Sequence, residues 1–342
     1  SEPNLKIINF IVEEKPTGEI SAGAGFGTNG GTVAFTVKEN NWLGEGKSLA
    51  LDVEIDQESL AGSLNFNDPN YDFLGNSINY SLASEKNDKP DKGYENSIIS
   101  AGVGTSFEQY KDVVASLGLE FTYDDLKTEN SASDSLKKQA GTFDELAFSY
   151  GFSQDKRNRS FKPTSGFITS FRQTLPIYAD KSFIENTFVA SRYKTLSENI
   201  VGSGKLYLSA INGVGDEDVR ISKRLYIPSK KLRGFESGKI GPKDSGDFIG
   251  GNYTAVLNAS TTLPEFGANL ETIDFQIFFD AANVWGVDYN SSLDNSHLRS
   301  SVGLSVDWFT IVGPLNFSVA QPISKADTDK TETVRFNIGT TF

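Results

Sequence analysis

The last ten residues, Thr333-Val334-Arg335-Phe336-Asn337-Ile338-Gly339-Thr340-Thr341-Phe342, alternate strictly between two kinds of side chain. Val334, Phe336, Ile338 and Phe342 fall on one face of an extended strand, and polar or small residues fall on the other. A strand of this kind meets two different solvents, and an aromatic residue at its end is typical of bacterial outer-membrane barrels. The pattern therefore predicts a strand with lipid on one side and a polar lumen on the other.

The composition of the 342-residue chain agrees with a barrel made of strands. The hydrophobic share is only 37%, glycine numbers 32, and no apolar run approaches the roughly 18 residues that a transmembrane helix needs. A soluble chain of this length would allow two or more domains. In lipid, however, only a closed barrel satisfies the backbone groups of strands, so a membrane interpretation requires many strands that close on themselves.

Charge and residue usage exclude several classes of function. The chain has no cysteine, a net charge of -13 and a pI near 4.7, which rules out thiol catalysis and thiolate metal sites and disfavours binding to nucleic acid. The acidic residues either lie in the lumen and outer loops or simply keep the chain soluble. The single histidine, His297, lies in a polar loop, and no nucleophile elbow, phosphate loop or zinc spacing is present. We therefore expect no enzyme activity, cofactor or metal.

Alternating stretches recur about every twenty residues, and we count sixteen of them. An even number of strands places both ends of the chain on the same side of the membrane. Short connectors, such as 67–75 and 310–314, are expected on the periplasmic side, and long polar ones, at 84–96, 123–141, 212–250 and 282–298, outside. Four aromatic residues at strand ends are expected to form interfacial girdles: Trp42, Tyr71, Trp285 and Trp308. The alternative is that they are ordinary aromatic residues at the strand ends of a soluble β-protein. The sequence thus predicts a 16-stranded antiparallel transmembrane β-barrel at residues 17–342.

The longest of these connectors contains the most specific motif, Leu232-Arg233-Gly234-Phe235. It resembles the loop motif, usually Val-Arg-Gly-Phe, of the BamA family within the barrel-assembly and two-partner-secretion superfamily. Further similar segments flank it: Ile240-Gly241-Pro242, Gly250-Gly251-Asn252, Phe278-Phe279-Asp280, Asn283-Val284-Trp285, Val312-Gly313-Pro314-Leu315, Ala320-Gln321-Pro322 and Phe336-Asn337-Ile338-Gly339. Glu14 to Gly18 resembles the junction with a periplasmic POTRA domain. The resemblance therefore spans nearly the whole chain, and residues 1–16, with a strand at Leu5 to Glu13, are expected to be the tail of a truncated POTRA domain and its linker.

The resemblance implies that the long loop folds into the lumen and that Arg233 meets acidic residues on the following strands. Arginine suits this role because it stays charged and offers five donors in a planar fork. Asp280 matches one family acid, and alternation with Ile277 and Phe279 turns it inward. Ser260 stands where the family usually has glutamate. Either Asp280 holds Arg233 with help from the Ser260 hydroxyl, or a loop acid such as Asp244 or Asp247 replaces the missing glutamate. The remaining alternative is that Arg233-Gly234-Phe235 is only an exposed turn.

The first strand is rich in glycine and small residues, which weakens its packing and its register. Pairing between the first and last strands closes the barrel, and the resemblance implies that this contact is a lateral gate. The gate residues are expected to be Ile20, Ala22, Gly23, Ala24, Gly25, Phe26, Phe336, Ile338, Gly339 and Phe342. Gly339 could end the pairing and kink the last strand inward, or the small residues could only relieve crowding in a curved wall.

The function that the resemblance implies is assembly and insertion of other outer-membrane barrels, without covalent chemistry. The expected partners are unfolded barrel substrates, accessory lipoproteins of the barrel-assembly (BAM) complex that bind through POTRA domains, lipid and lipopolysaccharide, and no nucleic acid. The alternative is a pore: a two-partner-secretion translocator or a passive porin. Both place the chain in the bacterial outer membrane, and a TamA-type assembly factor is not distinguished from a BamA-type one by the barrel sequence.

Overall fold

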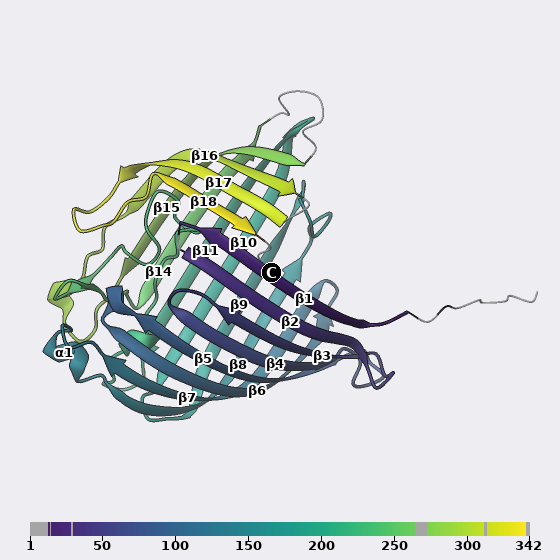
Figure 1. The fold of residues 1–342 in the computed structure, drawn as a ribbon, viewed down its shortest axis with the longest axis horizontal. Helices are drawn as coiled ribbons and strands as arrows, with labels where there is room; N and C mark the ends of the chain where they lie inside the picture. Colours follow the sequence, from purple (N-terminus) through teal and green to yellow (C-terminus); the bar gives the residue numbers. More distant parts are fainter. Residues whose placement is uncertain (1–12, 14, 29, 264–271, 311–312, 340–342) are drawn as a thin grey trace, which may run out of the picture.

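A computed structural model describes residues 13, 15–28, 30–263, 272–310 and 313–339. Sixteen antiparallel strands form one closed barrel, which confirms the predicted fold (Figure 1). In barrel order they begin with β1 (Gly18–Gly27), β2 (Gly30–Trp42), β3 (Lys47–Ile55), β4 (Ser59–Asp68), β5 (Ser77–Lys89), β6 (Tyr94–Tyr110), β7 (Val113–Thr128) and β8 (Gly141–Asp155). They continue with β9 (Gly166–Ala179), β10 (Phe183–Ser197), β11 (Ile200–Gly213), β14 (Tyr253–Thr262), β15 (Ile273–Trp285), β16 (Arg299–Thr310), β17 (Gly313–Ser324) and β18 (Val334–Gly339), which closes on β1.

Alternation along the strands separates a lipid-facing surface from a polar lumen. Leu51, Leu64 and Leu82 occupy one cross-strand row, and between 40% and 56% of each residue's surface is exposed. On the opposite face, the Thr36 hydroxyl donates a hydrogen bond of 2.8 Å to Asp52. The outward rows bury their apolar surface in hydrocarbon, while the inward polar groups bond one another, as a membrane barrel requires.

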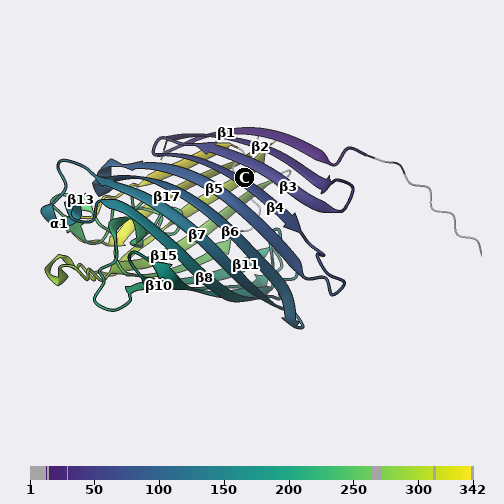
Figure 2. The ribbon, with the colours of Figure 1, turned by 90° about the horizontal axis from the view of Figure 1, so that it is seen from below.

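The two ends of the barrel differ in their connectors. The end where β1 starts has the short turns after β2, β6 and β10, whereas the much longer connector after β11 lies at the other end; the first end is therefore the periplasmic side. The opposite end gathers α1 (Asp134–Lys137) and the long loop after β11, including β13 (Asp247–Phe248), as Figure 2 shows. Among the described residues, no helix has both the length and the apolar character that crossing a membrane would take.

Several strands extend further at the outer end than the sequence pattern predicted. The expected loop 84–96 is mostly strand, since β5 reaches Lys89, β6 starts at Tyr94, and only η1 (Pro90–Lys92) and Gly93 lie between them. β7 likewise continues to Thr128. These extensions leave the lipid region, so backbone pairing persists while the apolar alternation that marks a membrane strand disappears.

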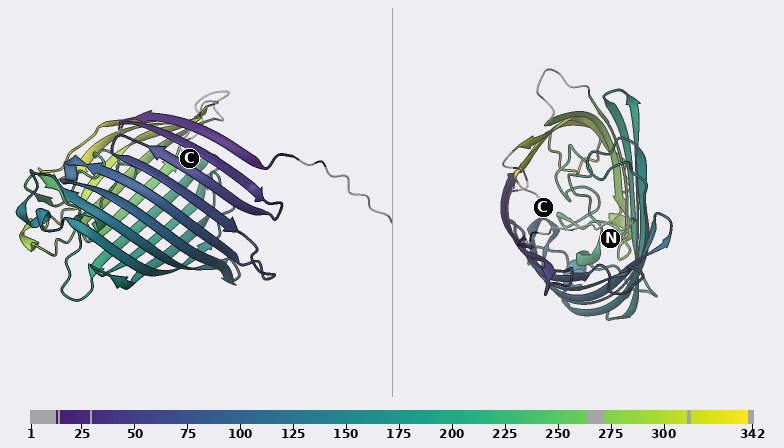
Figure 3. Two further views of the ribbon diagram at one scale, coloured as in Figure 1. Left: turned by 60° about the horizontal axis from the view of Figure 1, so that its bottom comes forward. Right: turned by 90° about the vertical axis from the view of Figure 1, so that its right-hand side faces the viewer.

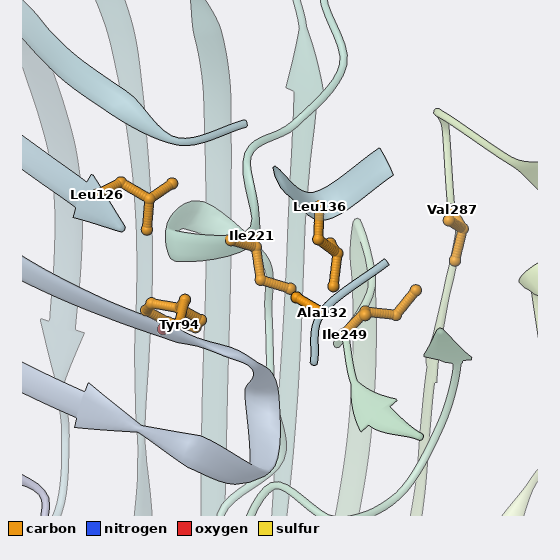
Figure 4. Close-up of a cluster of buried hydrophobic side chains, with 7 residues drawn as sticks. All are labelled: Tyr94, Leu126, Ala132, Leu136, Ile221, Ile249 and Val287. Atoms are coloured by element: carbon orange, nitrogen blue, oxygen red, sulfur yellow. The ribbon is translucent and has the colours of Figure 1, made fainter. Parts of the chain in front are cut away.

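Buried side chains lie inside the outer mouth of the barrel. One cluster joins Tyr94 and Leu126 on the wall to Ala132 and Leu136 beside and within α1, and to Ile221, Ile249 and Val287 from two other loops (Figure 4). Viewed from the periplasmic end, coil segments occupy the space within the ring of strands (Figure 3, right). The outer loops thus pack on each other and on the wall, and this packing positions the loop described next.

Candidate functional site

The connector at 214–252, between β11 and β14, is hereafter called the long loop. It contains η2 (Ile221–Lys223) and a two-stranded hairpin of β12 (Lys243–Asp244) with β13. Leu232 and Phe235 are each only 1% exposed. They pack in one cluster with two further loop residues and with lumen-facing residues of β14 and β15: Ile227, Ile240, Val256, Ala282 and Val284. Burial of these apolar side chains holds residues 230–236, hereafter called the tip of the long loop, against the inner wall.

Arg233 and Asp280 form the central polar contact of the site. The guanidinium donates two parallel hydrogen bonds, from Nε at 2.7 Å and from Nη2 at 2.8 Å, and the Arg233 backbone N–H donates a third at 3.1 Å. The Asp280 side chain is fully buried, and the Arg233 guanidinium carbon lies 3.4 Å from the ring centroid of Phe278. Bidentate geometry and stacking on an aromatic ring are the interactions that arginine makes and lysine does not.

Asn258, a residue that the sequence analysis did not select, completes this contact. Its Nδ2 donates bonds of 2.8 Å to Asp280 Oδ1 and to the backbone carbonyl of Lys231. It lies directly opposite Asp280 across the β14–β15 pair. The alternation of apolar and polar residues on β14 predicts that Asn258 faces the lumen. Its contact with Asp280 depends on the register between two strands, which the alternation does not determine.

None of the other proposed partners of Arg233 bonds it among the described contacts. Ser260 faces the same cavity as Arg233, but its hydroxyl pairs with that of Ser203 at 2.8 Å. Asp244 accepts bonds from Ser133 at 2.6 Å and Tyr289 at 3.0 Å, in the outer mouth. Asp247 lies opposite Asp244 in the same hairpin. The described contacts therefore contain neither the proposed help from Ser260 nor the substitution by Asp244 or Asp247. Ser260 bonds Ser203, and the two aspartates lie in the β12–β13 hairpin.

Gly234 has a backbone conformation that favours glycine, with φ of +93°. A Cβ atom at this position would lie 3.2 Å from the Cβ of Ala320 and 3.3 Å from that of Ser301. We expect Gly234→Ala to lower the free energy of unfolding by about 1–2 kcal/mol, since a left-handed conformation costs a side chain that much and the neighbours leave little space. Urea unfolding in detergent measures it. Gly246→Ala, also at positive φ but with open space around it, is the matched control for the steric part.

The tip of the long loop pairs with the connector between β17 and β18, at 325–333. Phe235 and Thr331 form an antiparallel bridge, flanked by backbone bonds from Glu332 to Gly234 and from Glu236 to Lys330, each 3.0 Å. The backbone carbonyl of Arg233 also accepts a bond from the Ser301 hydroxyl on β16. The tip is thus attached both to the wall at β15 and β16 and to the hairpin that ends in the last strand.

A second buried arginine fixes this connector. Arg299, at the start of β16, donates to Asp329 from Nε at 2.9 Å and from Nη2 at 3.1 Å, and both side chains are fully buried. Asp329 also accepts a bond of 3.3 Å from the backbone N–H of Gly241 in the long loop. This pair could not be predicted from the sequence, because Asp329 lies in a connector without periodicity.

The contact between β1 and β18 is hereafter called the seam. Among the described residues, β1 pairs with β2 at ten positions and with β18 at three, namely Gly25 with Gly339, Phe26 with Ile338, and Gly27 with Asn337. In Figure 1, the described part of β18 (yellow) lies beside one end of β1 (purple). Among the described residues, the periplasmic half of β1 has no partner on this side.

The residues predicted for the gate are placed along both strands of the seam. Ile20 and Phe26 are 76% and 60% exposed, Ile338 is 46% exposed, and the rings of Phe26 and Phe336 lie 6.1 Å apart. Ala22, Gly23, Ala24 and Gly25 pair with β2. Gly339 is still in register with Gly25, so pairing continues to that residue, and Phe342 lies outside the described residues.

The fold and the anchored loop together define a class: a sixteen-stranded outer-membrane barrel whose lumen holds a loop fixed by a buried arginine–aspartate pair. The family model for the Omp85 superfamily domain matches residues 41–342, and the chain belongs to that superfamily. The match confirms the family resemblance, and the BamA relatives described next, together with the sixteen-stranded barrel, confirm the bacterial outer-membrane location.

Within this superfamily, the relatives that the chain resembles include proteins named BamA. The chain is 27% identical to outer membrane protein assembly factor BamA of Neorickettsia risticii, over 98% of this chain and 46% of that protein. It is also 27% identical to BamA of Neisseria meningitidis serogroup B, over 99% and 49%. The crystal structure of Haemophilus ducreyi BamA lacking POTRA domains 1–3 has the same fold, with a TM-score of 0.89 and 24% identity over 96% of this chain and 71% of that one. The chain spans about half the length of the curated relatives that it matches.

Proposed function

We propose that this chain is the membrane barrel of an outer-membrane protein assembly factor, which folds and inserts other barrels through the seam without covalent chemistry. The names of the BamA relatives support assembly as the function. The observation that carries the mechanism is the glycine content of the seam: in two of its three described register pairs, Gly25 with Gly339 and Gly27 with Asn337, β1 contributes no side chain. Little side-chain packing therefore holds β1 to β18 there, so the seam is the place where the barrel opens at least cost.

An open seam exposes the backbone donors and acceptors of β1 as a strand edge. An unfolded substrate can add a strand to such an edge, because main-chain hydrogen bonds are available to any sequence. In this mechanism the Arg233–Asp280 anchor keeps the long loop fixed to the wall, and the loop in turn holds the connector that leads into β18. The anchor therefore sets the position of one side of the seam.

The partners of this proposal follow from the same mechanism. Unfolded outer-membrane barrels are the substrates, and lipid and lipopolysaccharide contact the outer wall. Accessory lipoproteins would bind through POTRA domains joined to residues 1–16.

The proposal is tested by the folding rate of an unfolded outer-membrane barrel in liposomes that contain the full-length protein. We expect faster folding than in protein-free liposomes, because an exposed strand edge lowers the barrier to the first strand pairing. An equal amount of an unrelated barrel of similar size controls for membrane defects. Ion conductance without any acceleration of folding would contradict the proposal and favour the alternative, a translocating or passive pore.

A further inference from the structure

A cavity of about 330 Å³ lies in the lumen beneath the tip of the long loop. Its wall residues lie close to the periplasmic ends of their strands: Ser203 is near the start of β11 at Ile200, and Ser260 is near the end of β14 at Thr262. The tip of the loop forms the opposite side, with Lys230, Lys231 and Arg233. The cavity is therefore placed where solutes from the periplasmic side meet the loop.

The lining of this cavity is strongly positive in a chain whose net charge is -13. It contains Lys205, Lys230, Lys231 and Arg233, and none of the described residues that line it is acidic. Arg233 is neutralised by Asp280. The three lysines, of which Lys231 is half-buried, form no ion pair with any residue that the structure describes. Four other cations of the long loop each have an acidic partner: Arg220, Lys223, Arg224 and Lys239.

Three unneutralised ammonium groups around one cavity repel each other. Burial, followed by the charges of Lys205 and Lys230, lowers the pKa of Lys231 to about 8. The Lys231 ammonium lies 3.1 Å from the ring centroid of Tyr207, which is its nearest recorded stabilising contact. An anion in the cavity would remove this repulsion and would be held by several charges at once.

We propose that this lysine cavity is a binding site for a phosphate group. Free phosphate carries about 1.5 to 2 negative charges near pH 7, and every phosphate group presents several acceptor oxygens, which match three lysines better than a single carboxylate does. Lysine binds phosphate as a point charge and does not need a fixed fork geometry. Ser203 and Ser260 share one hydrogen bond between two hydroxyls, so one O–H is left to donate to an oxyanion.

Binding at this site would act on the loop that carries Arg233. Lys230 and Lys231 precede Leu232 and Arg233 directly, and the Lys231 carbonyl is held by Asn258 at 2.8 Å. A phosphate that bridges these lysines to Lys205 would connect the tip of the loop to β11, in addition to its attachment at β15. The group could come from free phosphate or from a phospholipid headgroup. Both present phosphate oxygens to the lysines, although the headgroup phosphodiester carries only one negative charge.

The test is calorimetric titration of the full-length protein, in detergent and phosphate-free buffer at pH 7, with inorganic phosphate and separately with short-chain phosphatidylglycerol. The test variant is Lys230→Gln/Lys231→Gln. The control is Lys137→Gln/Lys138→Gln, which removes the same charge from two adjacent exposed lysines in the outer loop. We expect saturable binding with a Kd of about 1 mM or tighter, weakened about tenfold or more in the test variant and unchanged in the control.

Binding should also weaken as the pH rises above about 8, when Lys231, which faces Lys205, Lys230, Arg233 and Tyr207, loses its proton. Binding of phosphate alone identifies the free ion as the ligand, and binding of the lipid alone identifies the headgroup. Equal affinity of test and control variants, or no saturation below about 100 mM, would overturn the site. The melting temperatures of both variants exclude unfolding as the cause, and the titration does not depend on assembly activity, so it can fail while the proposed function stands.

Discussion

Arg233→Ala in the full-length protein is expected to reduce the folding rate of a substrate barrel nearly to that in protein-free liposomes. The substitution removes both guanidinium bonds to Asp280, whose side chain is fully buried. It also removes the stacking on Phe278. A buried carboxylate left without its cation costs about 3–5 kcal/mol, so the tip of the long loop should leave the wall. The connector to β18 pairs with that tip and should lose its position with it.

The matched control is Arg157→Ala. Arg157 also forms a two-bond contact with a carboxylate, that of Asp155, but the pair lies at the periplasmic turn after β8 and both side chains are partly exposed. Exposed pairs contribute about 0–1 kcal/mol, so this variant should retain its stability and its activity. Urea unfolding in detergent and the liposome assay give the two measurements for both variants.

A double variant separates the loss of the contact from the penalty of the buried charge. Arg233→Ala/Asp280→Ala leaves no unpaired carboxylate, so it should recover about 1–3 kcal/mol relative to Arg233→Ala. Activity should remain low, because the loop still lacks its anchor. A single variant as active as wild type would show that the anchor has no part in assembly.

Most of the barrel wall could be predicted from the sequence, because lipid imposes one rule on every strand. Where one face meets hydrocarbon, apolar residues alternate with polar ones, as Leu51 and Asp52 do on β3, and the strand is readable. Beyond the membrane that rule ends. The outer part of β6, from Tyr94, turns buried residues toward the loops, and its polar residues such as Asn96 resemble those of a loop.

A residue of the candidate site could be predicted from the sequence only where it was sufficient to know which face of its strand the residue lies on. Asp280 faces the lumen because Ile277 and Phe279 face lipid, and the motif supplied its partner. Asn258 required the register of β14 against β15, and Asp329 required the path of a connector, neither of which leaves a periodic trace in the sequence. Ser260 was predicted, as one alternative, to help hold Arg233 because it stands where the family usually has glutamate, but its hydroxyl pairs with that of Ser203 on the facing strand.

Covalent closure of the seam should abolish assembly activity, and reduction should restore it. Phe26 and Ile338 are register partners across the seam, and both side chains face lipid. Opposed positions in antiparallel strands have Cα atoms about 4.5–5.5 Å apart, which lies within the range that a disulfide spans. Phe26→Cys/Ile338→Cys therefore joins β1 to β18, and because the natural chain has no cysteine, the introduced bond is the sole disulfide possible within it.

The control places the same bond on the other side of the same strand. Ala22→Cys/Phe35→Cys joins β1 to β2, which already pair at ten positions and which the proposed mechanism never separates. This oxidised variant should fold substrate at the wild-type rate, whereas the seam variant should show only the protein-free rate until a reductant is added. A substrate strand can add to β1 only when the edge of β1 is free. A disulfide between positions 26 and 338 keeps β18 on that edge. Full activity of the oxidised seam variant, with the disulfide verified by mass spectrometry, would mean that substrates fold without opening the seam.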